Sequence, residues 1–254
     1  MRRTLRRLDS GALSDRGLVR PTNQDALLCR PDLGVFAIAD GLGGHADGDL
    51  AARTAIEEIE RALLGTATRS EDLLKEAFHG AHRAIRERAL ETRGTATSRP
   101  VLRPRATTAV VLCLCTGARA LWGHVGDSRL YRLRRGRLAL LTADHTEAGQ
   151  LCREGTDFPL DLAHTNHLLA ALGVEDSLDP TVTLGDARHD DVWLLCSDGI
   201  SEPLSPEILQ QELAGEGPAQ RIAERLVAAA LAAGGPDNAT AVIIRAAAGR
   251  TALP

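Results

Sequence analysis

Apolar residues recur at every third or fourth position in two long segments, and this spacing predicts amphipathic helices. The first segment covers residues 50–64 and the second covers residues 70–90. Their apolar faces are formed by Ile56, Ile59 and Leu63 in the first segment and by Leu74, Phe78, Ala81 and Ile85 in the second. Ser70, followed by two acidic residues, is a suitable cap at the start of the second helix. Two further helices are expected near residues 205–213 and 218–233.

Short, mostly apolar runs predict the strands. They cover residues 35–40, 106–115, 118–127, 128–135, 137–142, 191–198 and 239–245. The linkers TGAR and RRGR between neighbouring runs are short enough for hairpins. Because helices and strands are gathered in separate blocks, an antiparallel α+β arrangement is favoured over a dinucleotide-binding fold, in which they alternate. Without a repeat or an internal linker, we expect one domain over residues 10–247, a basic segment over 1–9 and a tail over 248–254.

Composition narrows the functional classes. A chain of 254 residues that is 44% hydrophobic can form a substantial core. A net charge of −4 provides no basic face for nucleic acid, so a nucleic-acid partner is not expected. The N-terminal arginines precede no apolar core of a secretory signal, and no run of about 18 apolar residues is present to span a membrane. Five cysteines, an odd number in apolar contexts, are typical of reduced thiols in a cytoplasmic protein.

The glycine-rich turn after residues 35–40 leaves two kinds of site open. Glycines between a strand and a helix loosely fit the pattern that binds the phosphates of a dinucleotide. An aspartate leads this turn and two more follow closely, namely Asp40, Asp47 and Asp49. These charges would repel an anion, and the turn contains no lysine for a Walker-type loop. A carboxylate followed by glycines suits a hard cation with oxygen ligands better.

Further aspartates occur where apolar runs end or begin. Asp40, Asp127, Asp198 and Asp237 each stand beside a glycine or a turn, and Asp25 starts another apolar run. Any one of them is most simply read as a turn former or a helix cap. Five carboxylates at one edge of a sheet would repel one another, by about 4 kcal/mol for a pair about 4 Å apart at an effective dielectric constant of about 20. Cations would relieve this repulsion, and an all-oxygen ligand set favours Mg²⁺ or Mn²⁺ over zinc.

The sequence resembles the metal-dependent serine/threonine protein phosphatases of type 2C, the PPM family, in its bacterial branch. The resemblance covers nearly the whole chain, and its motifs stand in the family's order: SDRGLVRPTNQDA, FAIADGLGGHADGD, ATTAVV, HVGDSRLYRLRRGRLALLTADHT, LLCSDGISE and GGPDNATAVII. The resemblance implies a four-layer αββα sandwich, with two antiparallel sheets flanked by helices and a metal site in a cleft at one edge.

The resemblance also implies the ligands of the metals. Asp40 would bridge two tightly bound Mn²⁺ or Mg²⁺ ions, and the carbonyl of Gly41 would bind one of them. Asp198 and Asp237 would complete the other site, while Asp25 would act through water. Asp127 would join Asp198 in a weaker third site. A hydroxide bridging the two tight ions would then attack the phosphorus in line.

Two more residues match functional positions of the family. Arg20, five residues before Asp25, matches the phosphate-binding arginine of the family, and its planar fork suits phosphoryl oxygens. The alternative is a solvated loop arginine. His45 is a candidate acid for the departing serine or threonine oxygen, since histidine titrates near neutral pH, but it could also form only local hydrogen bonds. His124 and His145 also occupy motif positions and are expected to be structural.

The chain departs from the family pattern in two places. The family's usual glycine before the paired threonines is Ala106 here, which exchanges one small residue for another. The segment before Gly173 reads LLAALG, without the arginine often found there. This second change lies in the flap, about residues 147–190, which in the family borders the cleft and helps to select substrates.

The expected activity is hydrolysis of phosphoserine and phosphothreonine in proteins, opposing a bacterial serine/threonine kinase. The expected partners are therefore phosphorylated proteins, including such a kinase, and the chain is expected to act as a monomer. Two alternatives remain open: a pseudophosphatase that only binds phosphoproteins, and a phosphoesterase for small molecules on the same fold.

Overall fold

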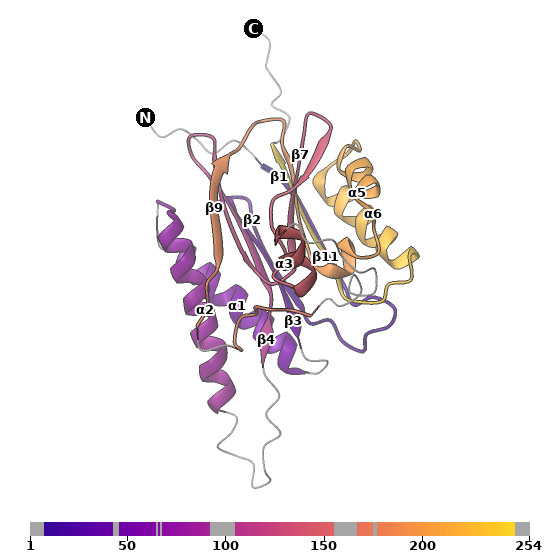
Figure 1. Ribbon diagram of the computed structural model, residues 1–254. Coiled ribbons are helices and arrows are strands. Elements are labelled where there is room, and N and C mark those ends of the chain that lie inside the picture. Colours follow the sequence, from indigo (N-terminus) through magenta and orange to yellow (C-terminus); the bar gives the residue numbers. More distant parts are fainter. Residues whose placement is uncertain are drawn as a thin grey trace.

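The computed structural model describes residues 8–42, 46–64, 66, 68–91, 105–154, 167–174 and 177–246. Two antiparallel sheets lie face to face between two layers of helices (Figure 1). This arrangement confirms the α+β sandwich expected from the sequence. None of the helices in the described ranges combines the length and the apolar character that a membrane span requires.

The first sheet has the strand order β1-β11-β10-β7-β8. Its strands are β1 (Leu8–Asp15), β7 (Arg129–Arg134), β8 (Arg137–Leu140), β10 (Val192–Cys196) and β11 (Ala239–Ala246). The chain's first described strand thus pairs with its last, because Leu8 lies opposite Ala246 and Asp15 lies opposite Ala239.

The second sheet has the order β2-β3-β5-β6-β9, with the short β4 also pairing with β3. Its strands are β2 (Asp25–Arg30), β3 (Val35–Leu42), β4 (Ala106–Thr107), β5 (Ala109–Cys115), β6 (Arg119–Val125) and β9 (Thr181–Asp186). Both hairpins predicted from short linkers, β5–β6 and β7–β8, are confirmed by their backbone pairing. Strands β6 and β7, in contrast, lie in different sheets, and Gly126 between them has a φ of 97° that favours glycine.

Helices cover the outer face of each sheet. On the second sheet these are α1 (Ala46–Leu64) and α2 (Glu71–Glu91), close to the two predicted helices. On the first sheet they are the short α4 (Asp198–Ser201), α5 (Pro206–Leu213) and α6 (Ala219–Ala232). A further helix, α3 (Glu147–Glu154), lies in the expected flap segment.

Alternation along the strands divides the core into three layers. In β3, Ala37 and Ala39 face α1 and α2, whereas Phe36 and Ile38 face the other sheet. Trp193 of β10 lies in the same layer between the sheets and is almost completely buried. Small residues on the helix-facing side let α1 approach β3 closely, and the large residues fill the space between the sheets.

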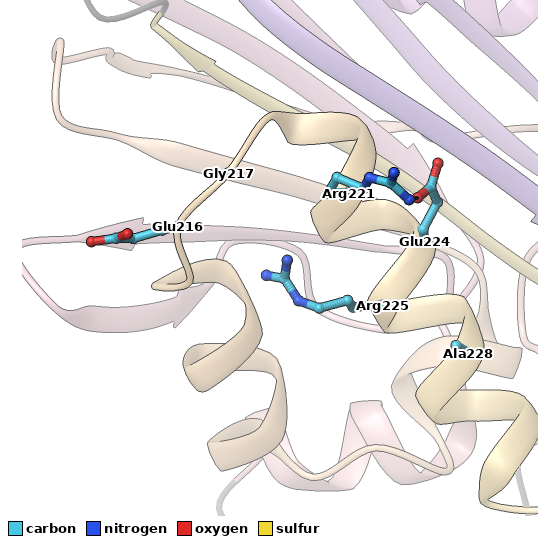
Figure 2. A pocket seen from close by; sticks show the side chains of 6 residues that line it. All are labelled: Glu216, Gly217, Arg221, Glu224, Arg225 and Ala228. Carbon is cyan, nitrogen blue, oxygen red and sulfur yellow. Dashed lines mark hydrogen bonds and ion pairs between the residues drawn. The ribbon is translucent and has the colours of Figure 1, made fainter.

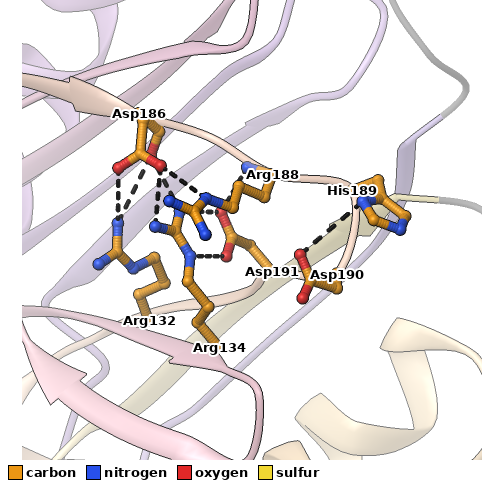
Figure 3. Close-up of polar contacts among 7 residues, drawn as sticks. All are labelled: Arg132, Arg134, Asp186, Arg188, His189, Asp190 and Asp191. Atoms are coloured by element: carbon orange, nitrogen blue, oxygen red, sulfur yellow. Dashed lines mark hydrogen bonds and ion pairs between the residues drawn. The ribbon is translucent and has the colours of Figure 1, made fainter.

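An arginine–aspartate cluster ties the two sheets together (Figure 3). Arg134 of β7 binds Asp191, just before β10, with Nε–Oδ1 and Nη2–Oδ2 distances of 2.5 and 2.7 Å. Arg134 also donates to Asp186 at the end of β9, which accepts from Arg188 as well. Because the Asp191 side chain is 0% exposed, this pairing fixes the start of β10 to β7 and to the end of β9.

Candidate metal centre

The strand pairing brings the predicted acidic residues to one end of both sheets. Asp25 is the first residue of β2 and lies directly opposite Asp40 of β3. In the other sheet, β10 ends just before Asp198 and β11 begins just after the turn that holds Asp237, and these two strands are neighbours. Asp127 lies in the connection between β6 and β7, where the chain passes from one sheet to the other.

These carboxyls raise one another's pKa values. Burial, followed by the charges of Asp25, Asp198 and Asp127, raises the pKa of Asp40 well above its usual range. Burial and the charges of Asp237 and Glu202 raise the pKa of Asp198 to about 6.

The two flanking carboxyls are perturbed in the same direction. Burial raises the pKa of Asp25 to about 7 against the opposing effect of hydrogen bonds from Thr240 and Ser197. Burial and the charges of Asp198 and Asp144 raise the pKa of Asp127 to about 7. Four acidic groups therefore share a partly buried region in which full ionisation is unfavourable without added positive charge.

Uncharged groups hold Asp25 in place. Its Oδ2 accepts hydrogen bonds from Ser197 Oγ at 2.8 Å and from Thr240 Oγ1 at 2.6 Å. Its Oδ1 is buried and has no hydrogen-bond partner, and the same is true of Oδ1 of Asp198. Buried carboxylate oxygens without a partner are costly, and a cation is one group that would satisfy them.

The paired threonines before β5 fix the backbone at Asp40. The carbonyl oxygen of Asp40 accepts from the backbone N–H of Thr108 at 2.9 Å and from Oγ1 of Thr107 at 2.8 Å. Thr108 Oγ1 is in turn hydrogen-bonded to Ser128 Oγ at 2.7 Å. Asp40 is therefore held by rigid strands on both sides, which suits a group that must keep its position.

Gly41 is required by close packing of the backbone. A Cβ atom at this position would lie 2.3 Å from the carbonyl oxygen of Gly48 in α1 and 2.8 Å from that of Gln24. Any side chain would therefore push the start of α1 away from β3. Ala106 of β4, which replaces the family's usual glycine, is buried and pairs with Leu42 of β3.

From the loop between β1 and β2, Arg20 reaches the acidic centre, which consists of the carboxyls of Asp25, Asp40, Asp127, Asp198 and Asp237. Its Nη2 donates to Oδ2 of Asp237 at 2.5 Å, while about half of its side chain, 48%, stays exposed. Asp198 and Asp40 lie near enough for their charges to contribute to the raised pKa of Arg20, although the hydrogen bond to Asp237 is the largest cause. Arg20 thus combines a fixed position with access to a ligand from solvent.

The side-chain amide of Asn238 anchors this loop. Its Oδ1 accepts from the backbone N–H of Gln24 at 2.8 Å, and its Nδ2 donates to the carbonyl oxygens of Arg16 and Thr22 at 2.8 and 2.9 Å. Asn238 is almost completely buried and directly follows Asp237. It therefore joins both ends of the Arg20 loop to the turn that carries a predicted metal ligand.

Three predicted histidines have different outcomes. His45 lies outside the described residues, so its role as an acid stays a prediction. Nε2 of His124 is hydrogen-bonded to the carbonyl oxygen of Ala143 at 2.8 Å, and His145 Nδ1 accepts from the backbone N–H of Gly126 at 3.3 Å. The two rings pack 4.5 Å apart between their centroids, which agrees with the structural role expected for both.

Four residues that shape the site were not predicted from the sequence, namely Ser197, Thr240, Thr108 and Asn238. Each is uncharged and carries no metal-binding signature, so composition and charge could not select it. Their only signal is position, because Ser197 and Asn238 adjoin predicted ligands and Thr108 belongs to the paired-threonine motif. Their importance depends on contacts between segments that are distant in the sequence.

The donor set fits Mn²⁺ or Mg²⁺. Among the described residues, no group of three or more His, Cys, Asp or Glu side chains is arranged so that it could hold a metal ion by itself. Arg20 engages Asp237, and two hydroxyls engage Asp25, so part of the acidic oxygens bind protein groups. The unpartnered oxygens of Asp25 and Asp198, together with the raised pKa values, are what hard cations with oxygen ligands would relieve.

A separate shallow pocket of about 440 Å³ lies between α5 and α6 (Figure 2). It is lined by Glu216, Gly217, Arg221, Glu224, Arg225 and Ala228, none of which belongs to the acidic centre. Its arginines are already paired, since Arg221 binds Glu224 at 2.8 Å and Arg225 binds Glu212 at 2.6 Å. This pocket therefore offers little free positive charge for an anionic ligand.

Comparison with known proteins gives the family. The sequence model of the family "Protein phosphatase 2C" matches residues 20–233. The serine/threonine protein phosphatase PstP of Mycobacterium tuberculosis is 37% identical over 235 residues, which cover 91% of this chain. The chain spans 44% of the length of that relative. Protein phosphatase PhpP of Streptococcus pneumoniae is 27% identical over 93% of this chain and 97% of its own length.

Solved structures agree with the sequence comparison. The crystal structure of the M. tuberculosis phosphatase PstP matches with a TM-score of 0.82 at 32% identity, covering 94% of this chain and 98% of that one. A structure of the PstP catalytic domain in complex with two manganese ions matches with a TM-score of 0.80 at 33% identity, covering 94% and 97%. Sequence, fold and acidic centre thus agree, and the chain belongs to the protein phosphatase 2C family.

Proposed function

We propose that the protein hydrolyses phosphoserine and phosphothreonine in proteins with the help of Mn²⁺ or Mg²⁺. The observation that carries this proposal is the convergence of Asp25, Asp40, Asp127 and Asp198 in one partly buried region, where each carboxyl has a raised pKa. Membership of the protein phosphatase 2C family and the two manganese ions bound by the PstP catalytic domain support it.

Each acidic residue has a proposed part in holding the metals. Asp40 and the carbonyl of Gly41 would bind them from β3, and Asp198 and Asp237 would bind them from the other sheet. Asp25 would act through water, and Asp127 with Asp198 would hold a weaker third ion. When bound, the cations would supply the positive charge that activates water and neutralises the phosphate.

Arg20 is the proposed phosphate-binding residue. Its guanidinium group is half-exposed at the acidic centre and held there by the anchored loop. A planar guanidinium can donate two parallel hydrogen bonds to phosphoryl oxygens, which orients the phosphate as well as attracting it. His45 remains the proposed acid for the departing oxygen.

The proposed setting is a bacterial cytoplasm, with a serine/threonine kinase opposing the activity and the chain acting as a monomer. All five cysteines are free, which suits a reducing compartment. The kinase is supported by the substrate class, serine/threonine phosphate in proteins, that the name of the relative PstP gives.

Hydrolysis of a phosphothreonine peptide and of an aryl phosphate, before and after chelation, tests this function. We expect both activities to disappear with the chelator and to return with Mn²⁺. Peptide binding without hydrolysis would favour the pseudophosphatase. Turnover of nucleotide phosphates in preference to phosphopeptides would favour the small-molecule phosphoesterase.

A further inference from the structure

Two exposed apolar side chains directly precede Arg20. Leu18 is 65% exposed and Val19 is 70% exposed. Of the large apolar residues exposed in the described part of the chain, only these two are adjacent in the sequence. Single exposed apolar residues are common on protein surfaces, but a neighbouring pair beside a binding residue calls for a reason.

The loop holds this pair rigidly. The backbone N–H of Leu18 donates to the carbonyl oxygen of Gly235 at 2.8 Å. The Leu18 side chain packs against Gly235: a Cβ atom in place of a hydrogen at Gly235 would lie only 3.0 Å from Cγ of Leu18. Gly17 packs against the carbonyl oxygen of Asp237, and Asn238 anchors the flanking residues Arg16 and Thr22. The pair is thus exposed although its backbone is well fixed.

A fixed apolar surface favours binding. Ordering a flexible loop on contact would cost conformational entropy, and a loop that is already anchored avoids most of this cost. Each apolar side chain that is removed from water against such a surface contributes favourably, roughly in proportion to the area covered.

The position of Leu18 and Val19 beside Arg20 indicates which ligand would cover them. Arg20 is the proposed phosphate-binding residue. Val19 is its direct neighbour in the chain, and only Val19 separates Leu18 from it. A phosphorylated side chain held by Arg20 would therefore bring its neighbouring residues next to these two side chains. A second copy of the chain would have to cover the acidic centre to use the same surface.

We propose that Leu18 and Val19 form an apolar ledge that binds an apolar side chain close in sequence to the phosphorylated residue of the substrate. The ledge rests on the proposed function, since it needs a phosphoprotein bound at Arg20. It makes the protein selective for phosphorylation sites with a leucine-like neighbour over sites with glycine or a charged residue there.

A set of phosphothreonine peptides tests the ledge. A single leucine is moved from position −3 to position +3 in a glycine–serine background, and kcat/KM of each peptide is divided by that of the peptide without leucine. For the parent protein we expect a ratio of about 5 to 10 at one or two positions. Because each ratio compares two substrates of one preparation, it does not depend on the fraction of folded enzyme.

The variants keep the shape of the ledge but remove its apolar character. Val19→Thr and Leu18→Asn replace each side chain by a polar one of similar size, and the double variant should lower the ratio to about 1. The matched control is Leu64→Ser at the end of α1, which removes an apolar side chain that is 43% exposed. Since α1 has 19 residues, about 28 Å of helix separates Leu64 from the acidic centre, and the parent ratio should persist.

Three results would overturn the ledge. The first is a ratio near 1 for the parent at every position, and the second is a raised ratio that survives in the double variant. The third is a parent dimer, detected by sedimentation, that the double variant dissociates, because a second copy would then occupy the surface. Absence of aryl phosphate hydrolysis by the parent with Mn²⁺ would instead contradict the proposed function itself.

Discussion

At the scale of single residues, uncharged groups determine how the acidic centre is arranged. Ser197 and Thr240 hold one oxygen of Asp25 and leave the other without a partner. Hydroxyl groups in this position orient a carboxylate without adding charge, which is how residues behind a metal ligand commonly adjust its affinity.

Thr240→Val removes the shorter of these two hydrogen bonds while keeping the size and branching of the side chain. We expect the affinity for Mn²⁺ to fall about tenfold, because Asp25 loses part of its orientation. Titration calorimetry measures the affinity. Thr54→Val is the matched control, since Thr54 is also buried but its Oγ1 donates to the carbonyl of Leu50 in α1 and accepts from Arg88 in α2, away from the acidic centre. Equal affinities of the Thr240 variant and the parent would show that Asp25 does not depend on this contact.

Arg20→Ala should raise KM for a phosphopeptide more than it lowers kcat, because the guanidinium group binds the phosphate in ground and transition states alike. Steady-state kinetics with a phosphothreonine peptide separates the two parameters. Arg16→Ala is the control from the same loop. Arg16 is exposed, and its side chain donates a hydrogen bond to the carbonyl oxygen of Pro21 and not to an acidic residue of the site. An unchanged KM with a large fall in kcat would place the role of Arg20 in the transition state alone.

At the scale of helices and strands, the hydrophobic pattern predicted most of the elements. The helical spacing in residues 50–64 and 70–90 identified α1 and α2, although α1 begins four residues earlier. The pattern did not reveal β9, whose sequence TVTLGD is mostly exposed at a sheet edge and lacks an apolar run. Nor did it show that β6 and β7 belong to different sheets, because that depends on the turn at Gly126.

The candidate site could be predicted to a similar degree. Carboxylates at strand ends are visible in the sequence, so the acidic residues can be identified from their positions along the chain. The hydroxyl of Thr240 and the amide of Asn238 act through contacts across 215 and 222 residues, and no local pattern encodes such distances.

Substitutions in the arginine–aspartate cluster test how the two sheets are joined. Asp191→Ala leaves Arg134, whose side chain is only 14% exposed, without its main partner. We expect the free energy of unfolding to fall by about 3 kcal/mol, as is usual when one member of a buried pair is removed. Asp186→Ala in the same cluster should cost less than about 1 kcal/mol, because its side chain is 53% exposed. Urea denaturation measures both, and similar losses for the two variants would contradict this division.

At the scale of the whole molecule, the sandwich gathers negative charge at the end where both sheets meet. The pKa values of Asp25 and Asp127 rise to about 7 and that of Asp198 to about 6, above the value near 4 expected in the unfolded chain. The folded protein therefore binds more protons than the unfolded chain between about pH 4 and pH 7. These groups contribute stability below pH 4 that is lost as the pH rises through 7.

In the presence of a chelator, the free energy of unfolding should consequently be lower at pH 7.5 than at pH 5. Asp127→Asn should reduce this difference by at most about 2.7 kcal/mol, since the raised pKa of Asp127 acts over about two pH units, from pH 5 to pH 7, and one unit corresponds to about 1.4 kcal/mol. Mn²⁺ should restore stability at pH 7.5 in the parent, because cations replace the protons. Urea denaturation at the two pH values measures this, and a chelated parent that is more stable at pH 7.5 would contradict the assignment.

We expect Asp40 to join the acidic residues of the two sheets into one metal centre. Titration calorimetry with Mn²⁺ on the parent, Asp40→Asn and Asp127→Ala tests it most directly, with circular dichroism to verify folding. We predict two tight sites in the parent, their loss in Asp40→Asn with the fold intact, and their retention in Asp127→Ala. Tight binding that survives in Asp40→Asn, or that disappears in Asp127→Ala, would contradict it.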